Sequence, residues 1–365
     1  MKGILLLEDG TQFHGTIKGS VQETMGEVVF NTSMTGYQEL LTDPSCFGQI
    51  LTLTFPLVGN YGINEEDAES SKPHVKGLIV RELCETPSNF RCTKKLNDYL
   101  AENNICALEG IDTRELTKTL REKGSMRGAI LTGEVSLQKI EDTLLQLKNY
   151  QLPNPVLETT VKKQETFFEE TDLYPVVLYD FGYKRSLLRS LKRRKCKVTV
   201  VPATTLAKEV LELQPKGILL SNGPGNPKDC QDQIQQIQLL AKSGIPIFGV
   251  GLGHQVAALA MGGETEQLKH GHRGVNHPVK DITQDRTYIT GQNHGYVVKD
   301  GSISPKVGTV SHVNINDGTI EGISYHSVPM FTVQFHPESS AGTLDTGYLF
   351  DEFVKRMEEG GKKNA

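Results

Sequence analysis

The chain has 365 residues, of which 37% are hydrophobic and 23% charged, and its formal net charge is −5. Since a typical domain has about 150 residues, this length predicts two domains, each with its own core. No apolar run approaches the roughly 18 residues that cross a bilayer. The net negative charge gives no electrostatic reason to expect a nucleic-acid partner. We therefore expect a globular protein of two domains, with no membrane and no nucleic acid among its partners.

The six cysteines are far apart and include no C-x-x-C pair. This spacing predicts reduced thiols in a cytoplasmic protein rather than disulfides, a zinc site or a redox motif. The apolar stretch after Met1 is too short for a signal peptide and runs into an acidic turn, which reads as a first β-strand. We therefore expect a cytoplasmic location.

The first part of the chain, residues 1–150, is predicted to form a β-rich domain. Asp9-Gly10 is a typical tight turn between two strands. Asp112 and Glu115 have the spacing of a capping box, and Gly124 follows a basic last turn, so a helix is expected between them. The expected strands cover 4–8, 12–17 and 27–31, and the expected helices cover 113–123 and 137–147.

Residues 151–174 lose hydrophobic periodicity and gain proline, threonine and charge, which is typical of an interdomain linker. From residue 175 to 358, apolar strands alternate with amphipathic helices. This pattern predicts a doubly wound α/β domain whose ligand site lies at the carboxyl ends of its strands. The expected strands are 176–179, 197–201, 217–220 and 245–250, and the expected helices are 185–195, 206–213 and 256–261.

Two side-chain clusters in this second part have both a functional and a structural interpretation. The basic stretch 184–197 could bind anions, but on an amphipathic helix such a run is usually a solvated face, which we expect here. The histidines between 270 and 277 could bind a metal, but no carboxylate or cysteine stands at ligand spacing. We expect a structural loop there and no metal site.

Two glycine-rich turns follow buried strands of the second domain. Residues 221–227 run from a strand into Gly223-Pro224-Gly225, which exposes backbone N–H groups that could stabilise an oxyanion, although a tight turn without a ligand is the alternative. Residues 248–255 match a nucleophile elbow between a strand and a helix. The central position of this elbow is Gly251, which offers no oxygen or sulfur. A dinucleotide site is disfavoured because the glycine spacing is wrong.

A third strand ends in His336-Pro337-Glu338. A histidine with a carboxylate two residues later can supply a general base and the group that orients it. His-Pro-Glu is common by chance, but its place after an elbow in the same domain favours the functional interpretation.

Together these segments resemble the class I glutamine amidotransferase domain, whose pattern is a G-x-C-x-G-H-Q elbow, a later H-P-E and a Ser-Asn-Gly-Pro-Gly strand end. In the first domain, residues 34–39, 42–45 and 59–64 resemble the amino-terminal domain of the carbamoyl-phosphate synthetase small subunit. Residues 271–278 and 292–296 match the same family, so the resemblance covers residues 1 to about 356. It implies a β-rich amino-terminal domain followed by a doubly wound class I glutamine amidotransferase domain.

The resemblance also implies the roles of individual residues. Backbone N–H groups of Gly223 and Leu252 would form the oxyanion hole, and His336 and Glu338 would complete a triad whose nucleophile position is Gly251. The implied glutamine pocket consists of Ser45, Gly223, Gly225, Leu252, Gln255, Asn293, Gly295 and Tyr296.

In the family, a cysteine thiolate attacks the glutamine carboxamide and a thioester is then hydrolysed. With Gly251 this route is closed, so we expect a chain that binds glutamine and hydrolyses it poorly. Loss of one triad member can lower turnover about 10⁶-fold. Cys46 adjoins Ser45, but it belongs to the other domain and lacks the elbow geometry, so we do not expect it to substitute.

The implied partner is a large synthetase subunit that uses ATP, bicarbonate and a metal, so no cofactor is expected on this chain. A non-catalytic scaffold of an ammonia-using synthetase is the main alternative. A stand-alone peptidase or γ-glutamyl hydrolase is disfavoured by the first domain. Both pyrimidine and arginine synthesis are open as the pathway.

Overall fold

The computed structural model describes residues 1–338 and 341–363, with side chains described up to residue 360. The chain divides into two compact units. The first comprises Met1–Pro153 together with Lys269–Arg273, and the second comprises the rest of the described chain from Asn154 onward. Among the described residues, no helix is long and apolar enough to cross a membrane.

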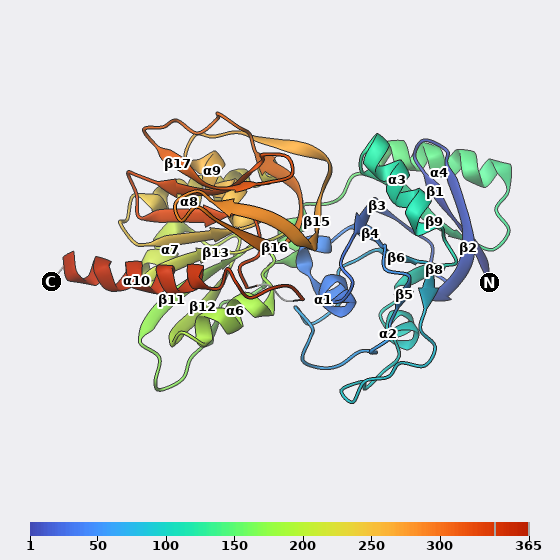
Figure 1. Ribbon diagram of the computed structural model, residues 1–365, viewed down its shortest axis with the longest axis horizontal. Helices are drawn as coiled ribbons and strands as arrows, with labels where there is room; N and C mark the ends of the chain where they lie inside the picture. The colour runs from blue at the N-terminus through green and yellow to red at the C-terminus, as the bar shows by residue number, and fades with distance from the viewer. Residues whose placement is uncertain (339–340, 364–365) are drawn as a thin grey trace. The chain divides into compact units, whose positions relative to one another are not determined.

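The first unit is built on a closed β-barrel (Figure 1). Its strands follow the order β1-β2-β8-β6-β4-β3-β9, in which the β3–β4, β4–β6 and β6–β8 pairs are parallel and the others antiparallel. Closure leaves no free strand edge. The strand bounds are β1 Lys2–Leu7, β2 Gln12–Gly19, β3 Thr24–Asn31, β4 Gln49–Leu53, β6 Gly77–Val80, β8 Cys106–Glu109 and β9 Met126–Thr132.

Short helices and one two-stranded sheet complete the first unit. The helix α3 shows why they form where they do. The Asp112 side chain accepts a hydrogen bond from the Glu115 backbone N–H at 2.9 Å, Leu116 and Leu120 are buried, and Gly124 ends the helix at φ 101°. The predicted helix 113–123 is thereby confirmed. The elements are α1 Tyr37–Thr42, η1 Pro44–Cys46, β5 Leu57–Val58, β7 Glu82–Leu83, α2 Leu96–Glu102, α3 Thr113–Lys123 and α4 Leu137–Asn149.

The second unit contains a ten-stranded sheet in the order β10-β12-β11-β13-β14-β19-β18-β16-β15-β17. The neighbours β12, β11, β13, β14 and β19 run parallel, as the alternation of strands and helices predicted. Its strands are β10 Glu165–Phe167, β11 Tyr174–Asp180, β12 Cys196–Pro202, β13 Gly217–Leu220, β14 Ile247–Val250, β15 Thr265–Asp281, β16 Arg286–Val298, β17 Gly308–Asn314, β18 Ile320–Tyr325 and β19 Met330–Val333.

Helices cover both faces of this sheet, which confirms the doubly wound prediction (Figure 1). Alternate residues of β11 point to opposite faces: Val177 and Tyr179 pack with α7, α8 and α9, whereas Val176 and Leu178 pack with α6 and α10. The helices are α5 Pro155–Thr159, α6 Arg185–Lys192, α7 Ala207–Glu212, η2 Pro227–Asp229, α8 Gln231–Ala241, α9 Leu252–Ala260 and α10 Tyr348–Lys363.

Two segments differ from the sequence prediction. Most of the segment expected as a linker, 151–174, belongs to the second unit: it forms α5, and β10 pairs with β12 across three residues. The histidine segment 270–277, expected as a loop, lies within the 17-residue strand β15. In both places pairing with other strands, β12 for β10 and β16 and β17 for β15, accompanies a structure that local composition does not reveal.

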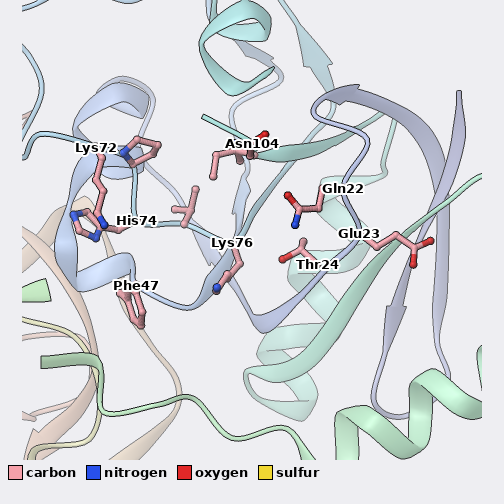
Figure 2. Close-up of a pocket in the computed structure, with 11 residues that line it drawn as sticks. Gln22, Glu23, Thr24, Phe47, Lys72, His74, Lys76 and Asn104 are labelled. Atoms are coloured by element: carbon pink, nitrogen blue, oxygen red, sulfur yellow. The ribbon is translucent and has the colours of Figure 1, made fainter. Parts of the chain in front are cut away.

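The buried side chain of His74, in the first unit, should make the stability of the fold sensitive to acid. It lines a pocket of about 230 Å³ with Phe47, Lys72 and Lys76, and Figure 2 shows the Lys72 side chain reaching to the His74 ring. Burial, with the nearby Lys72 charge, lowers the pKa of His74 to about 4. The unfolded chain therefore binds more protons between pH 6.5 and 4, and stability falls as the pH falls through that window.

We expect the free energy of unfolding to decrease by up to about 3 kcal/mol between pH 7 and pH 4 because of His74. His74→Gln removes this part of the pH dependence, whereas His14→Gln, at an exposed position, leaves it unchanged. Urea unfolding across this pH range measures the effect. Identical pH dependence in the wild type and His74→Gln would contradict it.

Candidate functional site

The elbow at Gly251 connects β14 directly to α9. Gly251 has φ 58° and ψ −113°, a conformation that side-chain-bearing residues rarely adopt. Its backbone N–H donates to the Val333 carbonyl of β19 at 2.9 Å. A Cβ built at this position would lie 3.2 Å from the Asn222 Cβ, so a side chain fits if that neighbour shifts slightly. The turn therefore has the strained geometry of a nucleophile elbow without its side chain.

The strand end after β13 lies beside this elbow. The Gly253 N–H donates to the Ser221 carbonyl at 2.9 Å, which ties the first turn of α9 to the strand end. Gly223 approaches the Phe181 carbonyl so closely that an added Cβ would lie 2.3 Å from its oxygen. Within the part of the chain that the structure describes, the N–H groups of Gly223 and Leu252 donate to no protein acceptor. Two such donors are what an oxyanion hole requires.

His336 and Glu338 form a buried pair after β19. The His336 Nδ1 and Glu338 Oε1 atoms are 2.8 Å apart, and both side chains are at least nine-tenths buried. The carboxylate can only accept, so Nδ1–H is the donor and Nε2 is the nitrogen that can accept a proton. The His336 N–H also donates to the Gly291 carbonyl at 2.9 Å. The pair has the arrangement of a general base held by an acid.

Lys184 also binds the Glu338 carboxylate, a contact that the sequence analysis did not predict. Its Nζ lies 2.9 Å from Glu338 Oε1, the same oxygen that His336 contacts, and the Lys184 side chain is only 6% exposed. The expectation that 184–197 is a solvated face is therefore wrong for Lys184. Burial alone would raise the pKa of Glu338, but the Lys184 ammonium and His336 together hold it well below its usual range. Glu338 is thus an ionised partner for the imidazole.

Asn222 positions the start of the Lys184 segment. Its Oδ1 accepts from the Lys184 backbone N–H at 3.2 Å, and its Nδ2 donates to the Gly182 carbonyl at 3.0 Å. The residue immediately before the Gly-Pro-Gly turn therefore fixes the loop after β11. Lys184 stands directly after a strand and before the helix begins. This position was the one signal in the sequence that could have distinguished Lys184 from the basic residues on the solvated face of the helix.

The predicted pocket residues on β16 lie in the same unit as the elbow. Gln255, on α9, donates through Nε2 to the Tyr296 carbonyl at 2.7 Å and to Gln334 Oε1 at 2.9 Å. Asn293, Gly295 and Tyr296 follow one another along β16. Gln255 is 3% exposed, so its amide connects α9 to β16. Gly225 follows the β13 turn at φ 94° and is exposed.

Ser45 belongs to the first unit, whereas the other predicted pocket residues belong to the second. It lies in η1, where its N–H donates to Asp43 Oδ1 at 2.8 Å. Its neighbour Cys46 is fully buried in the core of the first unit. A thiol packed in this way is not a free nucleophile, in agreement with the expectation that Cys46 does not replace the missing one.

The reactive groups lie at the carboxyl ends of three adjacent parallel strands. Gly223 follows β13, Gly251 follows β14 and His336 follows β19, and these strands are neighbours in the sheet. The arrangement offers a base, an acid that orients it and two backbone donors for an oxyanion. It supplies the parts of an acyl-transfer site except the nucleophile.

The chain is similar to known proteins along most of its length. Residues 5–130 match the family "Carbamoyl-phosphate synthase small chain, CPSase domain", and residues 177–356 match "Glutamine amidotransferase class-I". The chain is 49% identical to the carbamoyl phosphate synthase small chain of Clostridium perfringens, over 97% of this chain and 99% of that protein. It is also 49% identical to the carbamoyl phosphate synthase pyrimidine-specific small chain of Bacillus subtilis, over 98% and 96%. A small chain from Listeria monocytogenes is 48% identical, over 98% and 97%.

Proposed function

Because the chain belongs to the carbamoyl phosphate synthase small-chain family, we propose that its second unit binds glutamine but hydrolyses it only slowly. The observation that carries this proposal is the combination of an intact base and oxyanion donors with an empty nucleophile position. Gly223, Leu252 and the His336–Glu338 pair are in place, while Gly251 contributes no side chain. Binding and charge stabilisation should persist where covalent attack is lost.

The partner in this proposal is a large synthetase subunit that consumes the ammonia. ATP, bicarbonate and the metal bind to that subunit, so this chain has no cofactor of its own. The complex works in the cytoplasm. The residual hydrolysis proceeds by attack of a water molecule that His336 deprotonates through Nε2. The Glu338 carboxylate, by accepting from Nδ1–H, keeps the imidazole in the required tautomer.

The missing nucleophile at Gly251 is also consistent with a second candidate function. A small subunit without a nucleophile could serve as a scaffold or regulator of a synthetase that runs on free ammonia. Glutamine binding distinguishes the two functions, because a pure scaffold has no reason to keep a specific amide pocket.

The test combines binding and turnover in the reconstituted complex. We expect calorimetry to detect glutamine binding to the chain, and we expect ammonium to support carbamoyl phosphate synthesis far better than glutamine does. A complex that uses glutamine as fast as ammonium would overturn the role given to Gly251. Absence of glutamine binding would favour the scaffold, and absence of a complex with the large subunit would defeat the proposal as a whole.

A further inference from the structure

The side-chain amide of Gln334 is buried beside the elbow. Gln334 directly follows β19, two residues before His336, and its side chain is 1% exposed. Its backbone carbonyl oxygen lies 3.9 Å from the position that a Cβ on residue 251 would occupy. Its side-chain Oε1 accepts a hydrogen bond from Gln255 Nε2 at 2.9 Å. Gln334 therefore contacts a predicted pocket residue and stands next to the position of the missing nucleophile.

The backbone carbonyl of Tyr296 determines how these two amides are oriented. Gln255 Nε2 lies 2.7 Å from the Tyr296 carbonyl oxygen. A carbonyl oxygen can only accept, so the end of the Gln255 amide that faces it must be the NH₂ group. The same NH₂ group faces Gln334, so Gln334 must present its oxygen there. Both N–H groups of the Gln255 amide are thus used, one on Tyr296 and one on Gln334.

This orientation leaves Oε1 as the one polar atom of the Gln255 amide that can take a further partner. Among the described residues, no donor contacts this oxygen. The Gln255 backbone N–H donates to the Gly251 carbonyl at 3.3 Å, so Gln255 stands one helical turn, about 5.4 Å, after the elbow. Residues four apart lie on the same face of a helix. Gln255 therefore offers an acceptor one turn away from the position of attack.

The polar character of Gln334 does not serve the stability of the fold. Gln334 Nε2 is enclosed and has no acceptor within the part of the chain that the structure describes. A buried donor without an acceptor costs free energy, whereas an apolar side chain of similar size would avoid that cost. A residue that breaks such a rule next to a candidate site is explained by function. The useful atom of Gln334 is its oxygen, which holds the Gln255 amide.

A glutamine molecule carries two groups that can donate to Gln255 Oε1. Its carboxamide is the reacting group, which the oxyanion donors and His336 serve. The other donor is the α-ammonium group, and a charged donor makes the stronger hydrogen bond. We propose that Gln334 is a positioning residue, which holds the Gln255 amide so that Oε1 receives the α-ammonium group of glutamine. The inference rests on the proposed function and adds which group of the substrate this part of the site selects.

The test measures by calorimetry how tightly the full chain binds glutamine and glutaramate, which is glutamine without its α-amino group. We expect the wild type to bind glutaramate at least about 10-fold more weakly than glutamine, because a hydrogen bond from a charged donor is lost. Gln334→Met keeps the side-chain volume but removes the acceptor, so the Gln255 amide can turn. We expect this variant to bind glutamine about 10-fold more weakly than the wild type does and to bind glutaramate equally well.

Two control variants separate positioning from packing. Gln334→Glu keeps an acceptor for Gln255 Nε2 and should retain the preference for glutamine over glutaramate. Gln233→Met removes another buried amide of the second unit, which donates to the Ala203 carbonyl at 2.9 Å, and should leave both affinities unchanged. In the Gly251→Cys background, Gln334→Met should raise KM about 10-fold and change kcat by less than about 3-fold, because it removes a binding contact remote from the reacting bond.

The outcomes distinguish this inference from the proposed function. Equal affinity of the wild type for glutamine and glutaramate would overturn the inference and leave the proposed function standing. Unchanged glutamine binding in Gln334→Met, or an equal loss of affinity for both ligands, would also overturn it. If the wild type binds neither ligand, the proposed function fails as well. Because the first comparison uses only the wild type, it decides the question even if thermal melting shows that Gln334→Met is unfolded.

Discussion

Gly251→Cys is expected to raise glutaminase turnover by several orders of magnitude. Removing a triad nucleophile can cost about 10⁶-fold, and the rest of such a site retains about 10³ to 10⁴-fold over water. The remaining groups are already placed here, with His336 and Glu338 2.8 Å apart and the Gly223 and Leu252 N–H groups without protein acceptors in the described chain. Restoring the sulfur should therefore restore the covalent route.

The same substitution is expected to lower stability. Residue 251 has a positive φ, and a side chain in such a conformation costs on the order of 1 to 3 kcal/mol. The new Cβ must also displace Asn222 slightly, from a starting distance of 3.2 Å. Ammonia release and urea unfolding, measured on the same preparations, check both effects.

Gly251→Ser serves as the matched control for this prediction, because it adds a Cβ and a weaker nucleophile at the same place. It should show the same loss of stability with little gain in turnover. Similar glutamine turnover in the wild type and Gly251→Cys would show that the elbow is not the position of attack, and the interpretation of the site would be wrong.

Lys184→Met is expected to destabilise the second unit by about 3 to 5 kcal/mol. Removing one partner of a buried ion pair leaves the other charge poorly compensated, and here the enclosed Glu338 carboxylate would keep only its contact with His336. Methionine keeps most of the side-chain length, so the loss comes from charge rather than volume. Lys208→Met is the comparison, because Lys208 forms an exposed pair with Glu212 at 3.8 Å and should change stability by less than about 1 kcal/mol.

In the Gly251→Cys background, Lys184→Met should also change the pH dependence of turnover. Lys184 and His336 share one oxygen of Glu338, so the loss of the ammonium lets the carboxylate interact with the imidazolium alone. We expect the acidic limb of the kcat/KM profile to move upward in pH, since without the Lys184 ammonium the pKa of Glu338 is held down less and the carboxylate that orients the imidazole protonates at a higher pH. Lys184→Arg, which keeps the charge, should retain more of the wild-type profile. A change in stability with an unaltered pH profile would assign Lys184 a structural role only.

Much of the architecture could be predicted from local patterns. The helix 113–123 was predicted to the residue because its cap, apolar face and terminal glycine all lie within the segment itself. The strand 217–220 was likewise predicted, because a short apolar run with glycine and proline nearby has few alternatives. Segments whose structure depends on pairing with other strands, 151–174 and 270–277, were not predictable in this way.

The sequence by itself determined the elements with a strong local pattern, such as 113–123 and 217–220, together with the glycine at the elbow and the candidate residues around it, because these follow from local periodicity and from residue chemistry. Only the tertiary structure decided which charges are buried together. Lys184 and Glu338 are 154 positions apart in the chain, and nothing in either neighbourhood shows that one ammonium and one imidazole share a carboxylate oxygen. Burial and ion pairing depend on how the sheet brings separate strand ends together, and local sequence does not record that arrangement.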